Sequence, residues 1–249
     1  MDKAPIIQVC HRLIDAYKSG KLGQTRMPED SNPGFSDHER EACLSYFTLP
    51  MALNYQRDSY KLWEAALKTF RDQETRFVFD VAEVSSRSED ELRTALLKHR
   101  LALQPNKHVH TWRTIATTVK ENWGSFENLM DAADGDFLKL KQIIQTDFKN
   151  GFPYLSGPKI FNYWSFIIST YGRIDLKNRD QIEIAPDTHI TQCSVKLAVI
   201  TQDEAEKLSK EDISKRWREL LKGSSIDPID MHPPLWFWSR NNFIFDQMN

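Results

Sequence analysis

The sequence predicts an all-α protein. Apolar residues recur three or four positions apart over most of the chain from Ile6 to Leu221, which is the spacing of one face of a helix. Alternation with a period of two is limited to one short run, Arg76 to Val84, so this run is the single candidate strand. The 249 residues, 40% of them hydrophobic, are enough to enclose a sizeable core.

In chain order, the first predicted helix spans Ile6 to Tyr17 and is followed by a polar loop, Ser19 to Phe35, that contains several glycines and prolines. Asp37 is expected to cap the second helix. Pro50 ends or kinks that helix before the third one, Leu53 to Phe70. The later predicted helices share the same period of 3.6 residues: Glu89 to His99, Val109 to Trp123, Phe126 to Ala133, Phe137 to Phe148, Lys159 to Tyr171, Asp187 to Ile200 and Glu204 to Leu221.

Composition and charge exclude several classes of protein. A formal net charge of −2 argues against a protein that coats nucleic acid non-specifically, although helix N-termini can bind phosphates on a near-neutral chain. Cys10, Cys43 and Cys193 form neither a disulfide framework nor a metal-ligand pattern, and we expect no metal or cofactor. No apolar run approaches the roughly 18 residues that span a bilayer, and Met1 to Pro5 lacks the layout of a signal peptide. We therefore expect an intracellular protein of the cytoplasm or nucleoid, with no membrane contact.

A short turn, Leu155-Ser156-Gly157-Pro158-Lys159, opens an apolar and aromatic helix. Gly157 is expected to give the turn backbone freedom, and Pro158 suits the first position of a helix. Lys159 then falls in the first helical turn, where the helix dipole disfavours a cation. A neutral lysine amine can attack a carbon at the aldehyde level and form a Schiff base. A surface lysine lying along the aromatic helix is the alternative interpretation.

Asp187 follows Pro186 and is predicted to cap the next helix. As a carboxylate it could also stabilise positive charge that develops on a sugar, or orient a water molecule. His189, two residues later, is more often a structural residue than a catalytic one.

These segments, in their order along the chain, resemble the helix-hairpin-helix DNA glycosylases, the superfamily of endonuclease III and the 8-oxoguanine glycosylases. The lysine turn Gly157-Pro158-Lys159 and the later segment Asp187-Thr188-His189 resemble the two catalytic segments of that family. The resemblance extends from Ser45 to Ile200 and includes further segments upstream: Leu53-Asn54-Tyr55-Gln56-Arg57-Asp58, Ser88 to Lys107, Trp112-Arg113-Thr114-Ile115-Ala116 and Trp123-Gly124-Ser125-Phe126.

The resemblance implies a two-lobed helical bundle with a helix-hairpin-helix motif and a catalytic cleft between the lobes. It implies that the amine of Lys159 attacks C1′ of the nucleotide while Asp187 stabilises the charged sugar. Gln56 would enter the space left by the flipped base. The residues that the resemblance assigns to DNA binding are Gln56, Arg57, Ser156, Gly157 and His189, with Lys107, Arg113 and Lys149 as supporting phosphate contacts.

The sequence also departs from the family. The usual Leu-Pro-Gly-x-Gly hairpin is replaced by Pro153-Tyr154-Leu155-Ser156-Gly157, which keeps only the second glycine. The separation between Lys159 and Asp187 is longer than usual, and the polar stretch from Arg173 to Gln181 resembles an insertion. The four-cysteine cluster of endonuclease III is absent from the sequence.

Four segments are expected: N-terminal helices at 1–50 that pack with the C-terminal lobe, a central bundle at 51–150, the hairpin and aspartate segment at 151–222, and an aromatic tail at 223–249. Prolines prevent the tail from forming a long helix. The tail nevertheless contains two apolar and aromatic runs, Leu235-Trp236-Phe237-Trp238 and Phe243-Ile244-Phe245. The tail is expected to fold back over a groove of the helical body, or else to line a base pocket and stack on the flipped base.

The function expected from these features is that of a monomeric DNA glycosylase that acts on double-stranded DNA with a damaged or modified base. We expect Schiff-base lyase activity at abasic sites, with an oxidised purine such as 8-oxoguanine as the default base. A bulky modified base, including one carried by phage DNA, is the other substrate class. Two alternatives remain open: a monofunctional glycosylase with a water molecule activated by Asp187, and a non-catalytic helical module that binds DNA or protein.

Overall fold

The computed structural model describes residues 3–245, and these residues form thirteen α-helices and several short 3-10 and π turns, with no β-strand. The all-α prediction is therefore confirmed. The chain divides into two compact units: unit 1 contains residues 1–27 and 178–249, and unit 2 contains residues 28–177. Residues 1, 2 and 246–249, the ends of the predicted first and last segments, lie outside the described residues.

Unit 2 is built around an aromatic core. Tyr46 and Phe47 on the second helix lie against Trp63, with ring centroids 5.8 and 5.6 Å away, and all three side chains are buried. The indole of Trp164 donates a hydrogen bond of 3.0 Å to the hydroxyl of Thr48, which joins the helix of Lys159 to this core. The elements of unit 2 are η1 (Pro28–Asp30), α2 (Arg40–Ala52), α3 (Ser59–Arg71), η2 (Arg76–Phe79), α4 (Val81–Ser86), α5 (Glu89–Lys98), α6 (Pro105–Asn122), α7 (Phe126–Ala132), α8 (Phe137–Gln142), η3 (Ile143–Asp147), η4 (Lys149–Gly151) and α9 (Pro158–Thr170).

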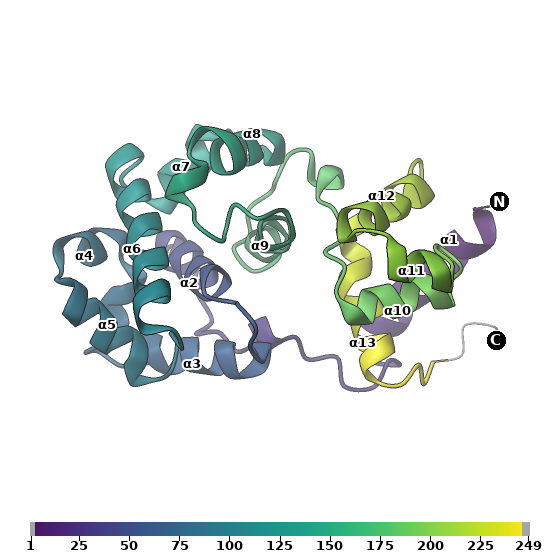
Figure 1. Cartoon of the computed structure of the whole chain (residues 1–249), viewed down its shortest axis with the longest axis horizontal. Helices are drawn as coiled ribbons and strands as arrows, with labels where there is room; N and C mark the ends of the chain where they lie inside the picture. The colour runs from purple at the N-terminus through teal and green to yellow at the C-terminus, as the bar shows by residue number, and fades with distance from the viewer. Residues whose placement is uncertain (1–2, 246–249) are drawn as a thin grey trace. The chain divides into compact units, whose positions relative to one another are not determined.

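Unit 1 joins the two ends of the described chain. Its first helix, α1, packs on its last, α13, and the rings of Tyr17 and Phe237 stack with centroids 5.8 Å apart (Figure 1). The indole of Trp217 donates to the hydroxyl of Ser194 at 2.8 Å in the same core. The elements of unit 1 are α1 (Ala4–Lys18), η5 (Arg179–Gln181), α10 (Thr188–Lys196), α11 (Gln202–Lys207), α12 (Lys210–Leu221), η6 (Pro228–Met231) and α13 (His232–Arg240).

The predicted segment 151–222 contributes to both units. Its hairpin and α9 belong to unit 2, whereas α10, α11 and α12 belong to unit 1. Lys159 and Asp187 are therefore parts of different units.

The candidate strand from Arg76 to Val84 is wrong, because this stretch forms η2 and the start of α4. Asp80 caps α4 by accepting hydrogen bonds from the backbone N–H groups of Ala82 and Glu83, at 2.8 and 3.1 Å. The buried positions Val78, Val81 and Val84 are three residues apart, which is a helical spacing rather than a strand spacing.

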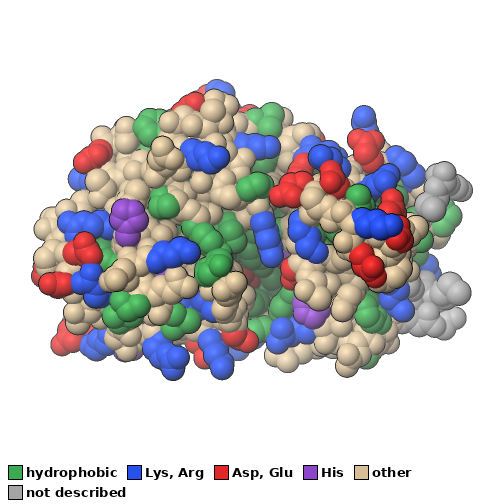
Figure 2. Space-filling view, in the orientation of Figure 1, with side chains coloured by type: hydrophobic (Ala, Val, Ile, Leu, Met, Phe, Trp, Pro, Cys, Tyr) green, Lys and Arg blue, Asp and Glu red, His purple; other side chains and the backbone are tan. Residues whose placement is uncertain are grey.

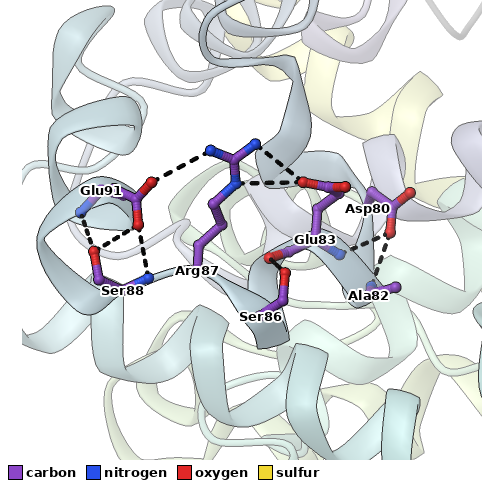
Figure 3. A network of polar contacts seen from close by, with 7 residues as sticks. All are labelled: Asp80, Ala82, Glu83, Ser86, Arg87, Ser88 and Glu91. Atoms are coloured by element: carbon purple, nitrogen blue, oxygen red, sulfur yellow. Dashed lines mark hydrogen bonds and ion pairs between the residues drawn. The ribbon is translucent and has the colours of Figure 1, made fainter.

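The turn between α4 and α5 is held by a network of charged and polar groups (Figure 3). Arg87 bridges Glu83 and Glu91, at 3.1 and 3.3 Å. Ser88 and Glu91 form a capping box, in which each side chain accepts a hydrogen bond from the backbone N–H of the other. These local bonds explain why a polar stretch ends one helix and begins the next.

Three predicted helix boundaries are also wrong. Asp37 does not cap α2, whose N-cap is Glu39; Asp37 instead pairs with Arg173. The third helix begins at Ser59 rather than Leu53, because Asp58 accepts a hydrogen bond of 2.9 Å from the N–H of Lys61 and caps it there. The stretch from Glu204 to Leu221 is two helices, because Ser209 caps α12.

The last of these stretches carries a mixed-charge face. Acidic and basic side chains lie intermingled over α11 and α12 (Figure 2), and they form exposed ion pairs such as Lys207 with Asp203 and Lys215 with Asp212. Such surface pairs contribute little to stability.

Candidate functional site

Lys159 lies in the first turn of α9, as predicted. Pro158 occupies the first helical position, and Gly157 is the N-cap residue, without any side-chain cap. The side chain of Lys159 is exposed. Within the described part of unit 2, the amine of Lys159 is therefore neither buried nor in an ion pair with a carboxylate.

In the hairpin turn before α9, the residue with a left-handed backbone conformation is not the expected one. Gly157 has an ordinary φ of −64°, whereas Tyr154 has a φ of 70° in the left-handed region. The prediction that Gly157 supplies dihedral freedom is therefore wrong. Glycine is instead needed for close approach, since a Cβ at position 157 would lie 3.2 Å from the carbonyl oxygen of Tyr154.

Most N–H groups of this turn are already used. Those of Ser156 and Gly157 donate to the carbonyl oxygens of Phe152 and Tyr154, at 2.9 and 3.1 Å. Pro158 has no N–H, and the first bond within α9 is made by Phe161. The N–H groups of Lys159 and Ile160 are thus the ones that α9 leaves for an anion.

Gln56 lies in a bend between α2 and α3, not at the start of a helix as expected. Its side chain is exposed, and its φ of 46° places it in the left-handed region. A side chain other than glycine costs about 1 kcal/mol or more in that conformation. Backbone strain of this kind concentrates at functional sites, so the strained loop is consistent with a role for Gln56 at its tip.

The loop of Gln56 and the hairpin before α9 are in direct contact. The hydroxyl of Tyr154 donates a hydrogen bond of 3.3 Å to the carbonyl oxygen of Asn54. The rings of Tyr55 and Tyr154 meet edge to face, with centroids 5.5 Å apart and an angle of 87°. The ammonium of Lys107 lies 4.5 Å from the centre of the Tyr55 ring. The fold therefore brings together two segments that are about 100 residues apart in sequence.

Arg57 supports this loop from within the protein. Its two terminal nitrogens donate to the carbonyl oxygens of Leu101 and Arg100, at 2.6 and 3.1 Å. The nearby imidazole of His108 is buried and accepts a hydrogen bond from the N–H of Leu103 at 3.2 Å. Burial, followed by the positive charges of Arg57 and Lys107, lowers the pKa of His108 to about 4. The base of the loop thus holds Arg57 and Lys107 near a buried imidazole.

The sequence analysis missed a buried acid, Glu29 of η1, that contacts the helix of Lys159. Glu29 is almost fully buried, and it accepts a hydrogen bond of 3.1 Å from the hydroxyl of Tyr163. Burial raises the pKa of Glu29 to about 7. Tyr163 lies four residues after Lys159 and hence on the same face of α9. The four-residue spacing of Lys159 and Tyr163 is visible in the sequence. The burial of Glu29 is not, because Glu29 lies in a stretch that has the composition of an exposed polar loop.

Asp187 is the N-cap of α10, as predicted. Its Oδ1 accepts a hydrogen bond of 2.9 Å from the N–H of Ile190. No hydrogen bond within the described structure uses its other oxygen, Oδ2. Asp187 can therefore hold its helix and still present one carboxylate oxygen to a substrate.

His189 is tied to α13. Its Nδ1 lies 3.0 Å from the hydroxyl oxygen of Ser239, and that hydroxyl donates to Oε1 of Gln192 at 2.8 Å. The ring of Trp236 lies nearly perpendicular to the imidazole, with centroids 5.7 Å apart. His189 is thus held in one orientation by two neighbours on α13, Ser239 and Trp236.

The aromatic tail folds back into unit 1, which confirms the first of its two predicted roles. Leu235, Phe237 and Trp238 on α13 are buried. Trp236 is partly exposed, and the guanidinium of Arg240 lies 4.8 Å from its ring centre. Trp236 is therefore the residue of this helix to which the prediction of a stacking role still applies.

The remaining candidates contribute less. Lys149 is exposed in η4, and Arg113 is half-buried on α6 with Nη1 unpartnered. A cavity of about 600 Å³ lies in unit 2 at the C-terminal end of α9, lined by Tyr171 and Arg173 among others, and it includes none of the predicted site residues.

Among residues 3–245, no group of three metal-ligating side chains comes together. All three cysteines are buried and unpaired, and burial raises the pKa of Cys10 and Cys193 to about 12. No helix within the described range has the length and apolar character needed to cross a membrane.

Comparison of the sequence with models of known protein families gives no match, and comparison with curated protein sequences gives none either. The interpretation of the site therefore depends on the residues themselves.

Proposed function

We propose that the chain is a DNA glycosylase of the helix-hairpin-helix type that flips out a damaged or modified base and cleaves its N-glycosidic bond. The observation that carries the proposal is the contact between the hairpin before α9 and the loop of Gln56, through Tyr154, Asn54 and Tyr55. A glycosylase needs both parts on one surface, because one holds the DNA backbone and the other fills the gap in the base stack.

In this proposal, each part has a separate task. The N–H groups of Lys159 and Ile160 at the start of α9 bind a backbone phosphate, and Lys107 beside Tyr55 adds positive charge. Gln56 enters the base stack. The exposed amine of Lys159 attacks C1′, the bond to the base breaks with its electron pair leaving on the base, and opening of the sugar ring gives a Schiff base. β-Elimination from that Schiff base nicks the strand.

Asp187 supplies the carboxylate that stabilises positive charge on the sugar in the transition state. Its Oδ2, which the cap leaves unused, is the atom assigned to this task. The same oxygen favours the second candidate, a monofunctional glycosylase in which Asp187 activates water and Lys159 contacts only phosphate. An oxidised purine or a bulky modified base remains the proposed substrate, and double-stranded DNA the proposed partner.

Borohydride trapping on a duplex with one preformed abasic site tests the lyase part of this proposal. We expect a covalent adduct with the wild-type chain and with Lys120→Gln, an exposed lysine of α6 that serves as a matched control, but none with Lys159→Gln. An adduct that persists in Lys159→Gln would assign the nucleophile to another amine. Absence of an adduct from a wild-type protein that binds the duplex would overturn the lyase proposal and favour the monofunctional one.

A further inference from the structure

The hydrogen bonds around His189 determine which of its ring nitrogens carries a proton. The hydroxyl of Ser239 has a single hydrogen, and this hydrogen is directed at Oε1 of Gln192, 2.8 Å away. The oxygen of Ser239 therefore meets Nδ1 of His189, 3.0 Å away, as an acceptor. Nδ1 must then be the donor in that contact, and the neutral imidazole carries its proton on Nδ1.

This tautomer limits what the other nitrogen can do. A neutral imidazole has one N–H, so Nε2 of His189 carries only a lone pair while Nδ1 donates to Ser239. The non-bridging oxygens of a DNA phosphate accept hydrogen bonds but donate none. Nε2 can contact a phosphate only when it also carries a proton, that is, when His189 is an imidazolium.

The surroundings of His189 are mixed in charge. Asp187 begins the same helix, and Arg240 of α13 lies over Trp236, whose ring faces His189. Two residues further along α10, Thr191 accepts a hydrogen bond of 2.8 Å from Lys210 of α12. The contacts described for the His189 ring are with Ser239 and Trp236, and neither is a carboxylate.

We infer that contact between His189 and a DNA phosphate is coupled to uptake of one proton at Nε2, and that Ser239 and Gln192 are positioning residues that enforce this coupling. The proton comes from solvent, and no covalent bond is made or broken. The inference rests on the proposed function, because it takes DNA as the ligand. Uptake of a proton on binding makes the affinity for DNA increase as pH falls.

The tautomer can be measured in the full chain without DNA. Two-bond ¹H–¹⁵N correlation spectra at a pH where the imidazole is neutral distinguish the two tautomers, and the signals missing from His189→Gln identify His189. We expect the Nδ1–H form in the wild type.

Gln192→Leu frees the Ser239 hydroxyl to donate to Nδ1, so this variant should shift towards the Nε2–H form. Gln192 is exposed, so the substitution should not impair folding. Gln202→Leu, another exposed glutamine of unit 1, should leave the wild-type tautomer unchanged. An Nε2–H tautomer in the wild type would overturn the inference.

Binding to a duplex with a stable abasic-site analogue, followed by fluorescence anisotropy between about pH 6 and 8, tests the coupling. Relative to His189→Gln, the wild-type Kd should fall as pH falls, by up to about tenfold per pH unit for one linked proton. In Gln192→Leu this additional dependence should be reduced, because a neutral Nε2–H can contact the phosphate. Parallel profiles for the wild type and His189→Gln would refute the coupling while leaving the glycosylase proposal intact. Failure to bind the duplex at any pH would instead refute the proposed function.

Discussion

The candidate residues of unit 1 and those of unit 2 are stabilised in different ways. In unit 1, Asp187 and His189 are each held by side-chain hydrogen bonds, one to the backbone of its own helix and the other to Ser239. In unit 2, Gln56 and Lys159 are exposed, and Gln56 lies on a strained backbone. The part that would act by charge is preorganised, whereas the part that would distort DNA is accessible and strained. Catalytic charge stabilisation benefits from fixed geometry, and a group that enters a base stack must be free of partners in its own protein.

The largest effect is expected at Asp187, where the cap and the carboxylate can be separated. Asp187→Ser keeps a capping oxygen and Asp187→Ala does not, so only the alanine variant should lose about 1 kcal/mol of unfolding free energy. Both should lower the rate of base excision by a factor on the order of 10² to 10³, because both remove the charge. The measurements are urea unfolding and single-turnover excision. If Asp187→Ser excises the base at the wild-type rate, Asp187 is only a cap.

A second effect sharpens the comparison inside unit 2, where the buried carboxyl of Glu29 sits beside the helix of Lys159. Glu29 keeps its proton up to about pH 7 in the folded protein, against an ordinary value of 4.5. Between these values the unfolded chain binds fewer protons than the folded one, so the free energy of unfolding falls as pH rises. The total fall in the free energy of unfolding that the raised pKa of Glu29 causes is about 3 kcal/mol.

Urea unfolding across this pH range checks the prediction by comparing the wild type with Glu29→Gln, which cannot titrate. As pH rises from 4.5 to about 7, the free energy of unfolding of the wild type should fall relative to that of Glu29→Gln. Glu64→Gln, an exposed position on α3, provides the matched control. Parallel profiles for the wild type and Glu29→Gln would show that burial does not perturb this carboxyl.

The smallest effect is expected at Gln56. Gln56→Gly relieves the left-handed backbone and should change the free energy of unfolding by no more than about 1 kcal/mol, since glycine also gains entropy in the unfolded chain. The rate of base excision should fall about tenfold, because the cost of unstacking a base is no longer offset by a filling side chain. Ala198→Gly in unit 1 starts from a φ of 55° and is the matched control. Equal excision by both glycine variants would remove Gln56 from the mechanism.

Local rules of helix formation predicted much of the fold. Pro158 at the first position of α9 and Asp187 as the cap of α10 are confirmed because each depends on a few neighbouring residues. The strand proposed from Arg76 to Val84 failed because alternation was weighed above the cap at Asp80. The long helix from Glu204 failed because Ser209, a strong cap, lies within a continuous amphipathic pattern.

The site was harder to predict because its contacts are long-range. Nothing near Tyr154 in the sequence shows that it meets Asn54 and Tyr55. Nothing near Glu29 shows that a polar loop buries its carboxyl beneath Tyr163. The assignment of Gly157 as the flexible residue failed for a similar reason, since the left-handed conformation belongs to Tyr154, whose ring is fixed by its distant partners.

The discontinuity of unit 1 has a consequence for synthesis of the chain on the ribosome. The helix α1 is made before unit 2, whereas its partner α13 is made after unit 2. All of unit 2 is translated between them and can fold as it leaves the exit tunnel. Throughout that interval the apolar face of α1, with Cys10, Leu13 and Ala16, has no native surface to cover it. A nascent chain arrested before α13 is therefore the state in which this protein would most need a chaperone.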